Sequence, residues 1–221
     1  MNTAHPPFEL LSPGGFVNTE QNPPEDGPDL VVYLHGFRSS PSSVKAQKMI
    51  TVFEQAGWSQ RLWVPQLPAS PAEAMRMVQA EIQCRLPEGG KLSILGSSLG
   101  GFYATVLGEQ YPDARVVLMN PAVKPYEDLV DQIGRKKVYF SEEEIEFVPE
   151  YLNDLKAMER LTLQNPSRYF LVAATGDEVL DFNQMVARYP GTHQCRIQGS
   201  DHALTEFDDW LPLIQLFLGV K

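Results

Sequence analysis

The chain has 221 residues, with 18 Lys and Arg against 28 Asp and Glu, which gives a formal net charge of −10. This length predicts one domain with a sizeable core, and the negative charge argues against nucleic acid or an anionic membrane surface as a partner. The first basic residue is Arg38, and no apolar run approaches the roughly 18 residues that a membrane span needs. We therefore expect a cytoplasmic protein, not inserted in a membrane, with a small or neutral ligand.

Residues 1–29 form the first segment, which we expect to be an extended arm ahead of the folded domain. Apart from "FELL" and "FV" the segment has few large apolar residues. A segment that is rich in proline and poor in apolar residues rarely forms a core. Its prolines are Pro6, Pro7, Pro13, Pro23, Pro24 and Pro28. The folded domain, 30–221, is expected to begin near Leu30.

From Leu30 onward, apolar segments of strand length alternate with helical patterns. The predicted strands in this part cover 30–35, 61–66, 91–96 and 115–120, and the predicted helices cover 42–56, 71–85 and 99–111. Continuous Val, Ile and Leu character between helices is typical of a parallel sheet that is buried on both faces. The fold class is therefore expected to be α/β, with a mostly parallel central sheet and helices on both faces.

The alternation stops after "NPAVKP", and residues 125–165 contain a helix-like pattern with no clear strand. Strands resume at 168–175 and 193–198, and an amphipathic helix follows at 205–218. An irregular segment between two sheet strands is where a lid or a binding wall is inserted. We expect a short lid at about 125–165.

The stretch "LSILGSSLGG" fits Gly-x-Ser-x-Gly in one frame, from Gly96 to Gly100 with Ser98 at its centre. A nucleophilic serine on a sharp strand-to-helix turn needs small neighbours, so that strand, helix and substrate can approach one another. The motif also arises by chance, but here it follows the strand "KLSIL" and opens a helix, so we interpret Ser98 as the nucleophile. A nucleotide site is disfavoured, because the glycine spacing and the Lys-Ser/Thr pair of phosphate-binding loops are missing.

The first predicted strand ends in "YLHGF", and the loop that follows it is expected to supply an oxyanion hole. We assign the donors as the backbone N–H groups of Phe37 and Leu99, because Gly36 allows the loop to turn inward and a helix begins at Leu99. His35 is interpreted as a structural residue that braces this loop rather than as a proton carrier. It precedes Ser98, whereas the expected chain order is Ser, Asp, His.

The acid and the base are expected after later strands. Asp177 directly follows "YFLVAATG", and Asp181 is its competitor, which we interpret as the N-cap of the next helix. Of the four histidines, His193 and His202 lie downstream of both Ser98 and Asp177; we interpret His193 as a surface residue and His202, in the loop after the last strand, as the base. Its ordinary pKa near neutrality suits proton transfer. The alternatives are a simple turn aspartate and a solvated loop histidine.

With these residues assigned, the sequence resembles the α/β-hydrolase superfamily and, more narrowly, the YqiA-like family of small bacterial esterases. The resemblance rests on "YLHGFRSSP", "GSSLGGFYA", "NPAVKPYE", "TGDEVLDF" and "DHALTEFDDW", which occur in this order. It implies an α/β-hydrolase fold and a Ser-Asp-His esterase or thioesterase that acts on acyl esters, with fatty acyl-CoA among the candidate substrates. It places the triad on Ser98, Asp177 and His202.

The function expected from the sequence is hydrolysis of a small-molecule carboxylic ester through an acyl-enzyme, with no metal or organic cofactor. Cys84 and Cys195 are expected to be ordinary unpaired thiols. The insertion holds more apolar residues than an exposed loop needs, so Phe140, Phe147 and Tyr151 are candidates for an acyl-binding wall; the alternative is that they only pack the segment onto the domain. The rival functions are a non-catalytic ligand-binding or scaffold protein on the same fold and a small peptidase.

Overall fold

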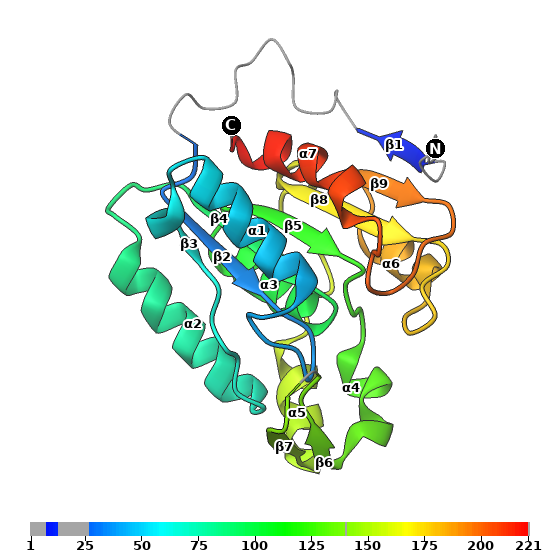
Figure 1. The fold of residues 1–221 in the computed structure, drawn as a ribbon. Helices are drawn as coiled ribbons and strands as arrows, with labels where there is room; N and C mark the ends of the chain where they lie inside the picture. The colour runs from blue at the N-terminus through cyan, green and yellow to red at the C-terminus, as the bar shows by residue number, and fades with distance from the viewer. Residues whose placement is uncertain (1–7, 13–26, 140, 221) are drawn as a thin grey trace.

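A seven-stranded sheet forms the centre of the molecule in the computed structural model, which describes residues 8–12, 27–139 and 141–220 (Figure 1). Its strands lie in the order β1-β9-β8-β5-β4-β2-β3. Strand β1 is antiparallel to β9, and all other neighbours run parallel. The strands of this sheet are β1 Phe8–Leu11, β2 Leu30–Leu34, β3 Leu62–Trp63, β4 Leu92–Ser97, β5 Arg115–Met119, β8 Tyr169–Ala174 and β9 His193–Ile197.

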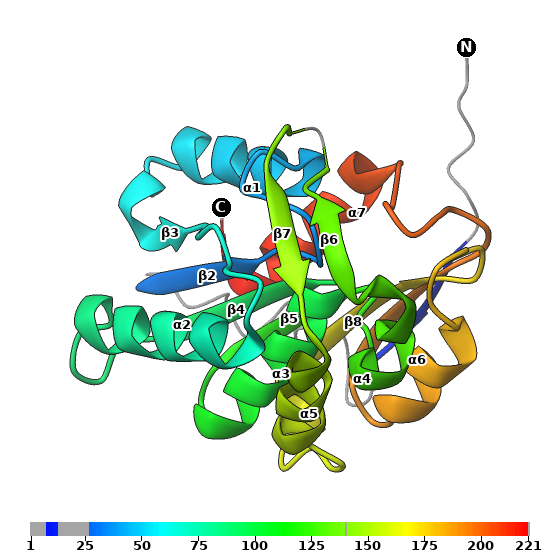
Figure 2. The ribbon, with the colours of Figure 1, turned by 90° about the horizontal axis from the view of Figure 1, so that it is seen from below.

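Helices cover both faces of this sheet, which confirms the predicted α/β class. The helices are α1 Val44–Gln55, α2 Pro71–Arg85, α3 Leu99–Gln110, α4 Pro125–Asp128, α5 Pro149–Met158, α6 Phe182–Arg188 and α7 Phe207–Leu218, with short 3-10 helices η1 Ser59–Arg61, η2 Val130–Gln132 and η3 Pro166–Arg168. Side chains alternate between the faces of a strand. In β2, Val31 and Tyr33 share a core with α1 and α7, whereas Val32 and Leu34 share one with α2 and α3. Figures 1 and 2 show the two helical layers.

Helix α2 covers the predicted residues, and its first turn carries two clear start signals. The hydroxyl of Ser70 accepts a hydrogen bond from the N–H of Glu73 at 3.3 Å, and Pro71 occupies the first helical position.

Within the part of the chain that the structure describes, no helix combines the length and the apolar character that a membrane crossing requires.

Two strands differ from the sequence-based expectation. The segment "FELL", expected in the N-terminal arm, forms β1 and pairs with the edge strand β9, so the arm contributes to the sheet. Strand β3 is shorter than the predicted 61–66, because Pro65 has no N–H to donate to a neighbouring strand.

The insertion also differs from expectation, because it contains a hairpin where no strand was predicted. Strands β6 (Gly134–Lys137) and β7 (Glu144–Phe147) pair antiparallel, with Arg135 opposite Glu146 and Lys137 opposite Glu144. Strand β6, "GRKK", has no apolar residue, and the polar–apolar alternation of β7, "EIEF", spans only four residues, so the sequence gives a weak strand signal here. Figure 2 shows the hairpin in front of the carboxyl ends of the parallel strands.

Candidate active site

The turn between β4 and α3 holds Ser98 in an unusual backbone conformation, with φ 56° and ψ −122°. Such a conformation costs about 1–3 kcal/mol for a residue other than glycine, so neighbouring groups must hold it. The N–H of Ser98 donates to the carbonyl of Met119 at 3.1 Å, and its own carbonyl accepts from Gly101 (2.9 Å) and Ala122 (3.0 Å). The turn therefore has the geometry that the Gly-x-Ser-x-Gly motif predicted.

The two glycines of the motif are required by close packing. A Cβ atom at Gly96 would collide with the backbone of Gly100, and one at Gly100 would collide with the carbonyl of Leu34. At Gly36, in the loop after β2, a Cβ atom would lie 3.1 Å from the Cβ atom of Ser98. Glycine at these three positions lets the strand, the helix and the loop meet around the serine.

The side chains of Ser98, Asp177 and His202 form one hydrogen-bonded chain, although they come from three separate loops. The Nε2 atom of His202 lies 3.0 Å from the Ser98 hydroxyl, and its Nδ1 atom lies 2.8 Å from Oδ2 of Asp177. The side chain of Asp177 is fully buried, whereas that of His202 is 21% exposed. A proton on Nδ1 leaves Nε2 free to accept the serine proton.

The carboxylate of Asp177 is held by the backbone that follows it. Its Oδ1 atom accepts hydrogen bonds from the N–H groups of Val179 and Leu180, both at 2.8 Å. Asp181 instead caps α6, because its Oδ1 atom accepts from the N–H of Asn183 at 2.8 Å. The structure thus places Asp177 against His202 and Asp181 at the start of α6.

The loop after β2 runs beside the serine, since a Cβ atom at Gly36 would lie 3.5 Å from the Ser98 hydroxyl oxygen. The N–H groups of Phe37 and Leu99 donate to no acceptor among the described residues, so both are available to a ligand. His35 braces this loop, with Nδ1 donating to the carbonyl of Gly36 at 2.9 Å and Nε2 accepting from the N–H of Leu67 at 3.0 Å. Burial lowers the pKa of His35, which favours the neutral ring that these two bonds require.

Asn120, at the end of β5, positions the loop that carries His202, and the sequence-based assignment missed it. This residue is buried and has φ 40°. Its Nδ2 atom donates to the carbonyls of Asp201 (3.0 Å) and His202 (3.3 Å), and its Oδ1 atom accepts from the N–H of Ala174 (2.9 Å). Asn120 therefore ties β5, β8 and the histidine loop together.

Two charged side chains hold the same loop from other directions. The Nζ atom of Lys45 donates to the carbonyl of Ala203 at 2.6 Å, and the carboxylate of Glu178 accepts from the N–H of His202 at 2.9 Å. Burial lowers the pKa of Lys45 to about 8, and the nearby carboxylates of Asp201 and Asp177 act in the opposite direction. The histidine is thus fixed through its main chain as well as its ring.

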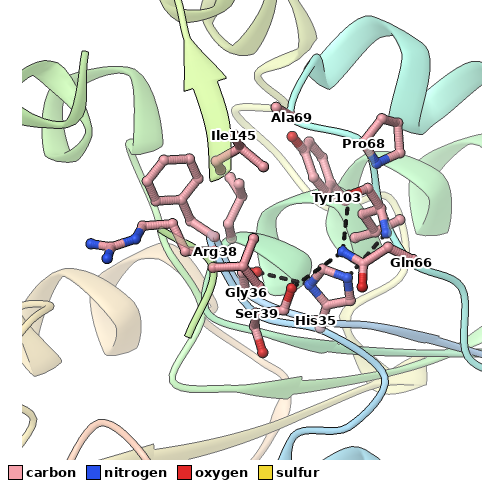
Figure 3. Close-up of a pocket in the computed structure, with 13 residues that line it drawn as sticks. His35, Gly36, Arg38, Ser39, Gln66, Pro68, Ala69, Tyr103 and Ile145 are labelled. Atoms are coloured by element: carbon pink, nitrogen blue, oxygen red, sulfur yellow. Dashed lines mark hydrogen bonds between the residues drawn. The ribbon is translucent and has the colours of Figure 1, made fainter. Parts of the chain in front are cut away.

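A small cavity lies beside the two predicted oxyanion donors, with a volume of about 30 Å³. Figure 3 shows residues that line it. The lining comes from the loop after β2, the segment before α2, helix α3 and the hairpin: His35, Gly36, Phe37, Arg38, Ser39, Gln66, Leu67, Pro68, Ala69, Leu99, Tyr103, Val138 and Ile145. Phe37 and Leu99, the residue that directly follows Ser98, thus both border this cavity.

The wall residues chosen from the sequence need correction. Phe147 and Tyr151 do not line the cavity; the hairpin contributes Val138 and Ile145 instead. Phe147, two residues after the lining residue Ile145, is buried. The centre of its ring lies 5.1 Å from that of Phe37 and 5.5 Å from that of Tyr151. Phe140 lies outside the described residues.

Neither cysteine belongs to this site. Cys84 is exposed and Cys195 is buried in β9, and both are free thiols. Burial raises the pKa of the Cys195 thiol to about 12, so it stays protonated. Among the residues that the structure describes, no group of three or more His, Cys, Asp or Glu side chains is placed to hold a metal ion.

The fold and the site geometry agree with what a comparison with known families finds. The model of the uncharacterised protein family UPF0227 matches residues 30–219, which run from β2 to the end of α7. The chain belongs to this family. UPF0227 is the YqiA-like family, so the resemblance to that family drawn from the sequence motifs is confirmed.

Solved structures of α/β hydrolases share this architecture at low sequence identity. A monoacylglycerol lipase from Paleococcus ferrophilus is 16% identical with a TM-score of 0.62, and the match covers 98% of this chain and 100% of that one. Mouse alpha/beta hydrolase domain-containing protein 10 is 15% identical with a TM-score of 0.60, covering 97% and 94%. An esterase from Pyrococcus furiosus is 14% identical with a TM-score of 0.58, covering 88% and 81%. The UPF0227 chain therefore has the α/β-hydrolase fold.

Proposed function

We propose that this UPF0227 protein is a serine hydrolase that cleaves carboxylic esters, acyl thioesters included, through an acyl-enzyme. The observation that carries the proposal is the position of His202, within hydrogen-bond distance of both the Ser98 hydroxyl and the Asp177 carboxylate. A serine hydroxyl is a weak nucleophile until a base accepts its proton, and a base needs a third group to orient it. The fold shared with esterases and lipases supports the same reaction class.

In the first half of the reaction, Ser98 Oγ attacks the ester carbonyl carbon while its proton moves to Nε2 of His202. The carbonyl oxygen becomes an oxyanion and accepts hydrogen bonds from the N–H groups of Phe37 and Leu99. The carbon–oxygen bond to the alcohol then breaks, and the leaving oxygen takes the proton from His202. The acyl group remains bonded to Ser98.

In the second half, water replaces the alcohol. His202 accepts a proton from the water as its oxygen attacks the acyl carbonyl carbon, and the same two N–H groups hold the oxyanion. The bond to Ser98 Oγ breaks, the serine takes back the proton from His202, and the carboxylic acid leaves. Asp177 keeps the imidazole oriented and stabilises its charged form in both halves. A thioester follows the same steps with a thiol as leaving group.

A fluorophosphonate probe tests the nucleophile directly. The wild-type protein should be labelled at Ser98, and Ser98→Ala should lose the label and lower kcat on short p-nitrophenyl esters by about 10⁴- to 10⁶-fold with an unchanged fold. Ser97→Ala is the matched control, because Ser97 is the last residue of β4 and should keep both label and activity. Label on Ser97 contradicts the assignment, and a wild-type protein that neither takes the label nor hydrolyses esters favours a non-catalytic binding protein.

A further inference from the structure

Arg38 connects the loop that carries the oxyanion donor Phe37 to the β6–β7 hairpin. The Nε atom of Arg38 donates to the carbonyl of Lys137 at 2.6 Å, and the carbonyl of Arg38 accepts from the N–H of Tyr139 at 2.8 Å. Its guanidinium lies 4.5 Å from the centre of the Tyr139 ring. Arg38 also has φ 60°, a conformation that costs free energy unless such contacts hold it. Three contacts therefore meet at this one residue.

The same loop holds the hairpin at a second point through aromatic rings. The Phe147 ring, at the end of β7, packs edge-on against that of Phe37 and is almost completely buried. Elsewhere the hairpin is mostly exposed, since its strands alternate between exposed and partly covered residues. Phe147 thus anchors the end of β7 in the core, and Arg38 holds the end of β6, where Val138 is also buried.

Between these two points, Val138 and Ile145 form part of the cavity lining next to the N–H groups of Phe37 and Leu99. A volume of about 30 Å³ has room for about one or two water molecules. It can take the methyl group of an acetyl ester, whereas a longer acyl chain exceeds this volume unless the hairpin moves away.

We infer that Arg38 is a specificity-determining residue that latches the β6–β7 hairpin over the acyl side of the site and so restricts hydrolysis to short acyl chains. This inference rests on the proposed ester hydrolysis. The latch also positions an oxyanion donor, because Arg38 directly follows Phe37 in the chain. Movement of the hairpin away from the site would therefore shift the loop that carries the Phe37 N–H. Figure 3 shows the Arg38 guanidinium directed away from the other labelled lining residues, as a latch on the outer side of the cavity requires.

The latch is tested first without any substrate, by hydrogen–deuterium exchange of the full chain. Arg38→Ala should speed exchange in β6 and at the Tyr139 amide by about tenfold, because a hydrogen bond from a charged donor is lost. Arg135→Ala is the matched control, since Arg135 is an exposed arginine of the same hairpin that faces Glu146 rather than Arg38. Unchanged exchange in Arg38→Ala overturns the latch, whatever the activity.

The second test compares p-nitrophenyl acetate with p-nitrophenyl octanoate. The wild type should prefer the acetate, and Arg38→Ala should raise the octanoate-to-acetate ratio of kcat/KM about tenfold while lowering kcat for the acetate, because the Phe37 N–H is less fixed. Arg38→Lys should restore part of both effects, and Arg135→Ala should match the wild type. Lengthening the alcohol of an acetate ester instead should give the same profile in wild type and Arg38→Ala.

The remaining outcomes test whether Arg38 controls the acyl chain length. A wild type that prefers octanoate, or an acyl ratio unchanged in Arg38→Ala despite faster exchange, overturns the control of chain length. A change confined to the alcohol series shows that the cavity holds the alcohol and refutes the acyl assignment. If the wild type hydrolyses no ester and takes no fluorophosphonate, the proposed function fails and the specificity role fails with it, whereas the exchange comparison still decides whether Arg38 holds the hairpin.

Discussion

Ser98, Asp177 and His202 lie on loops that are fixed by backbone hydrogen bonds at the ends of buried strands, whereas the β6–β7 hairpin is held at Arg38 and Phe147. The strands β4, β8 and β9, which lead into the three loops, are almost completely buried, while those of the hairpin are largely exposed. A buried, cross-bonded support keeps reacting groups within a narrow geometry. A partly exposed cover can open. The three loops therefore serve the chemical step, and the hairpin serves the selection of substrate.

The largest effect should come from the aspartate that orients the histidine. Asp177→Asn should lower kcat by about 10⁴-fold, because the amide favours the wrong tautomer of His202. Asp181→Asn should change the rate little and lower the free energy of unfolding by about 1 kcal/mol or less, since Asp181 caps α6. Steady-state kinetics and urea unfolding of both variants measure the contrast. Reversed phenotypes would place the acid on Asp181.

A pair of glycines compares the two regions directly. Gly100→Ala should lower the free energy of unfolding by about 3 kcal/mol or more, because the new Cβ atom meets the rigid carbonyl of Leu34. Gly134→Ala, at φ 105° in the hairpin, has open space around its Cβ position and should cost about 1 kcal/mol, since local opening limits the strain. Thermal unfolding checks both. Equal losses would contradict the difference in rigidity.

The buried amide of Asn120 sharpens the comparison further, because it supports the histidine loop without touching the reacting atoms. Asn120→Asp should lower kcat by up to about 100-fold with little change in KM, since it loses the two donated bonds to the loop but keeps an acceptor for Ala174. Asn183→Ala, at an exposed asparagine of α6, is the control. A rise in KM at constant kcat would show that Asn120 acts on substrate binding instead.

The smallest effect concerns His35, whose pKa burial lowers in the folded state. Below its unfolded pKa of about 6.5 the unfolded chain binds a proton that the folded chain excludes, so stability falls as the pH drops, by up to about 1.4 kcal/mol per pH unit. His35→Gln should unfold more easily at neutral pH but lose this part of the slope. Urea unfolding from pH 7.5 to pH 5.5 measures it. Parallel slopes in both proteins would show that His35 is not the group responsible.

The residues that the structure brings together could be predicted from the sequence because each follows a strand of the parallel part of the sheet. Ser98 and Asp177 come after the apolar strands β4 and β8, and His202 comes after the more polar β9. The carboxyl ends of parallel strands meet at one edge of a sheet. The sheet and most helix bounds followed from apolar periodicity for the same reason. Their catalytic roles stay predictions until the kinetics are measured.

The residues that were missed act through main-chain carbonyls far away in sequence. Asn120 reaches the loop of His202 across 82 positions, and Arg38 reaches Lys137 across 99. Every residue offers a carbonyl, so neither partner leaves a pattern in the sequence. The hairpin escaped prediction because β6 has no apolar residue and the alternation of β7 spans only four residues. The Phe147 side chain packs against Phe37 beside the cavity rather than in it.

Strand β1 has a consequence for solubility. It pairs with β9 over four residues, and Ser12 adds a hydrogen bond of 2.7 Å to His193. Without β1, the outer backbone groups of β9 would have no partner, and an open edge of this kind is a template on which further chains add and aggregate. A version of the protein that starts at Leu30 would retain the whole region matched by the family model, yet would expose that edge, so a shortened chain should precipitate at concentrations where the full chain stays in solution.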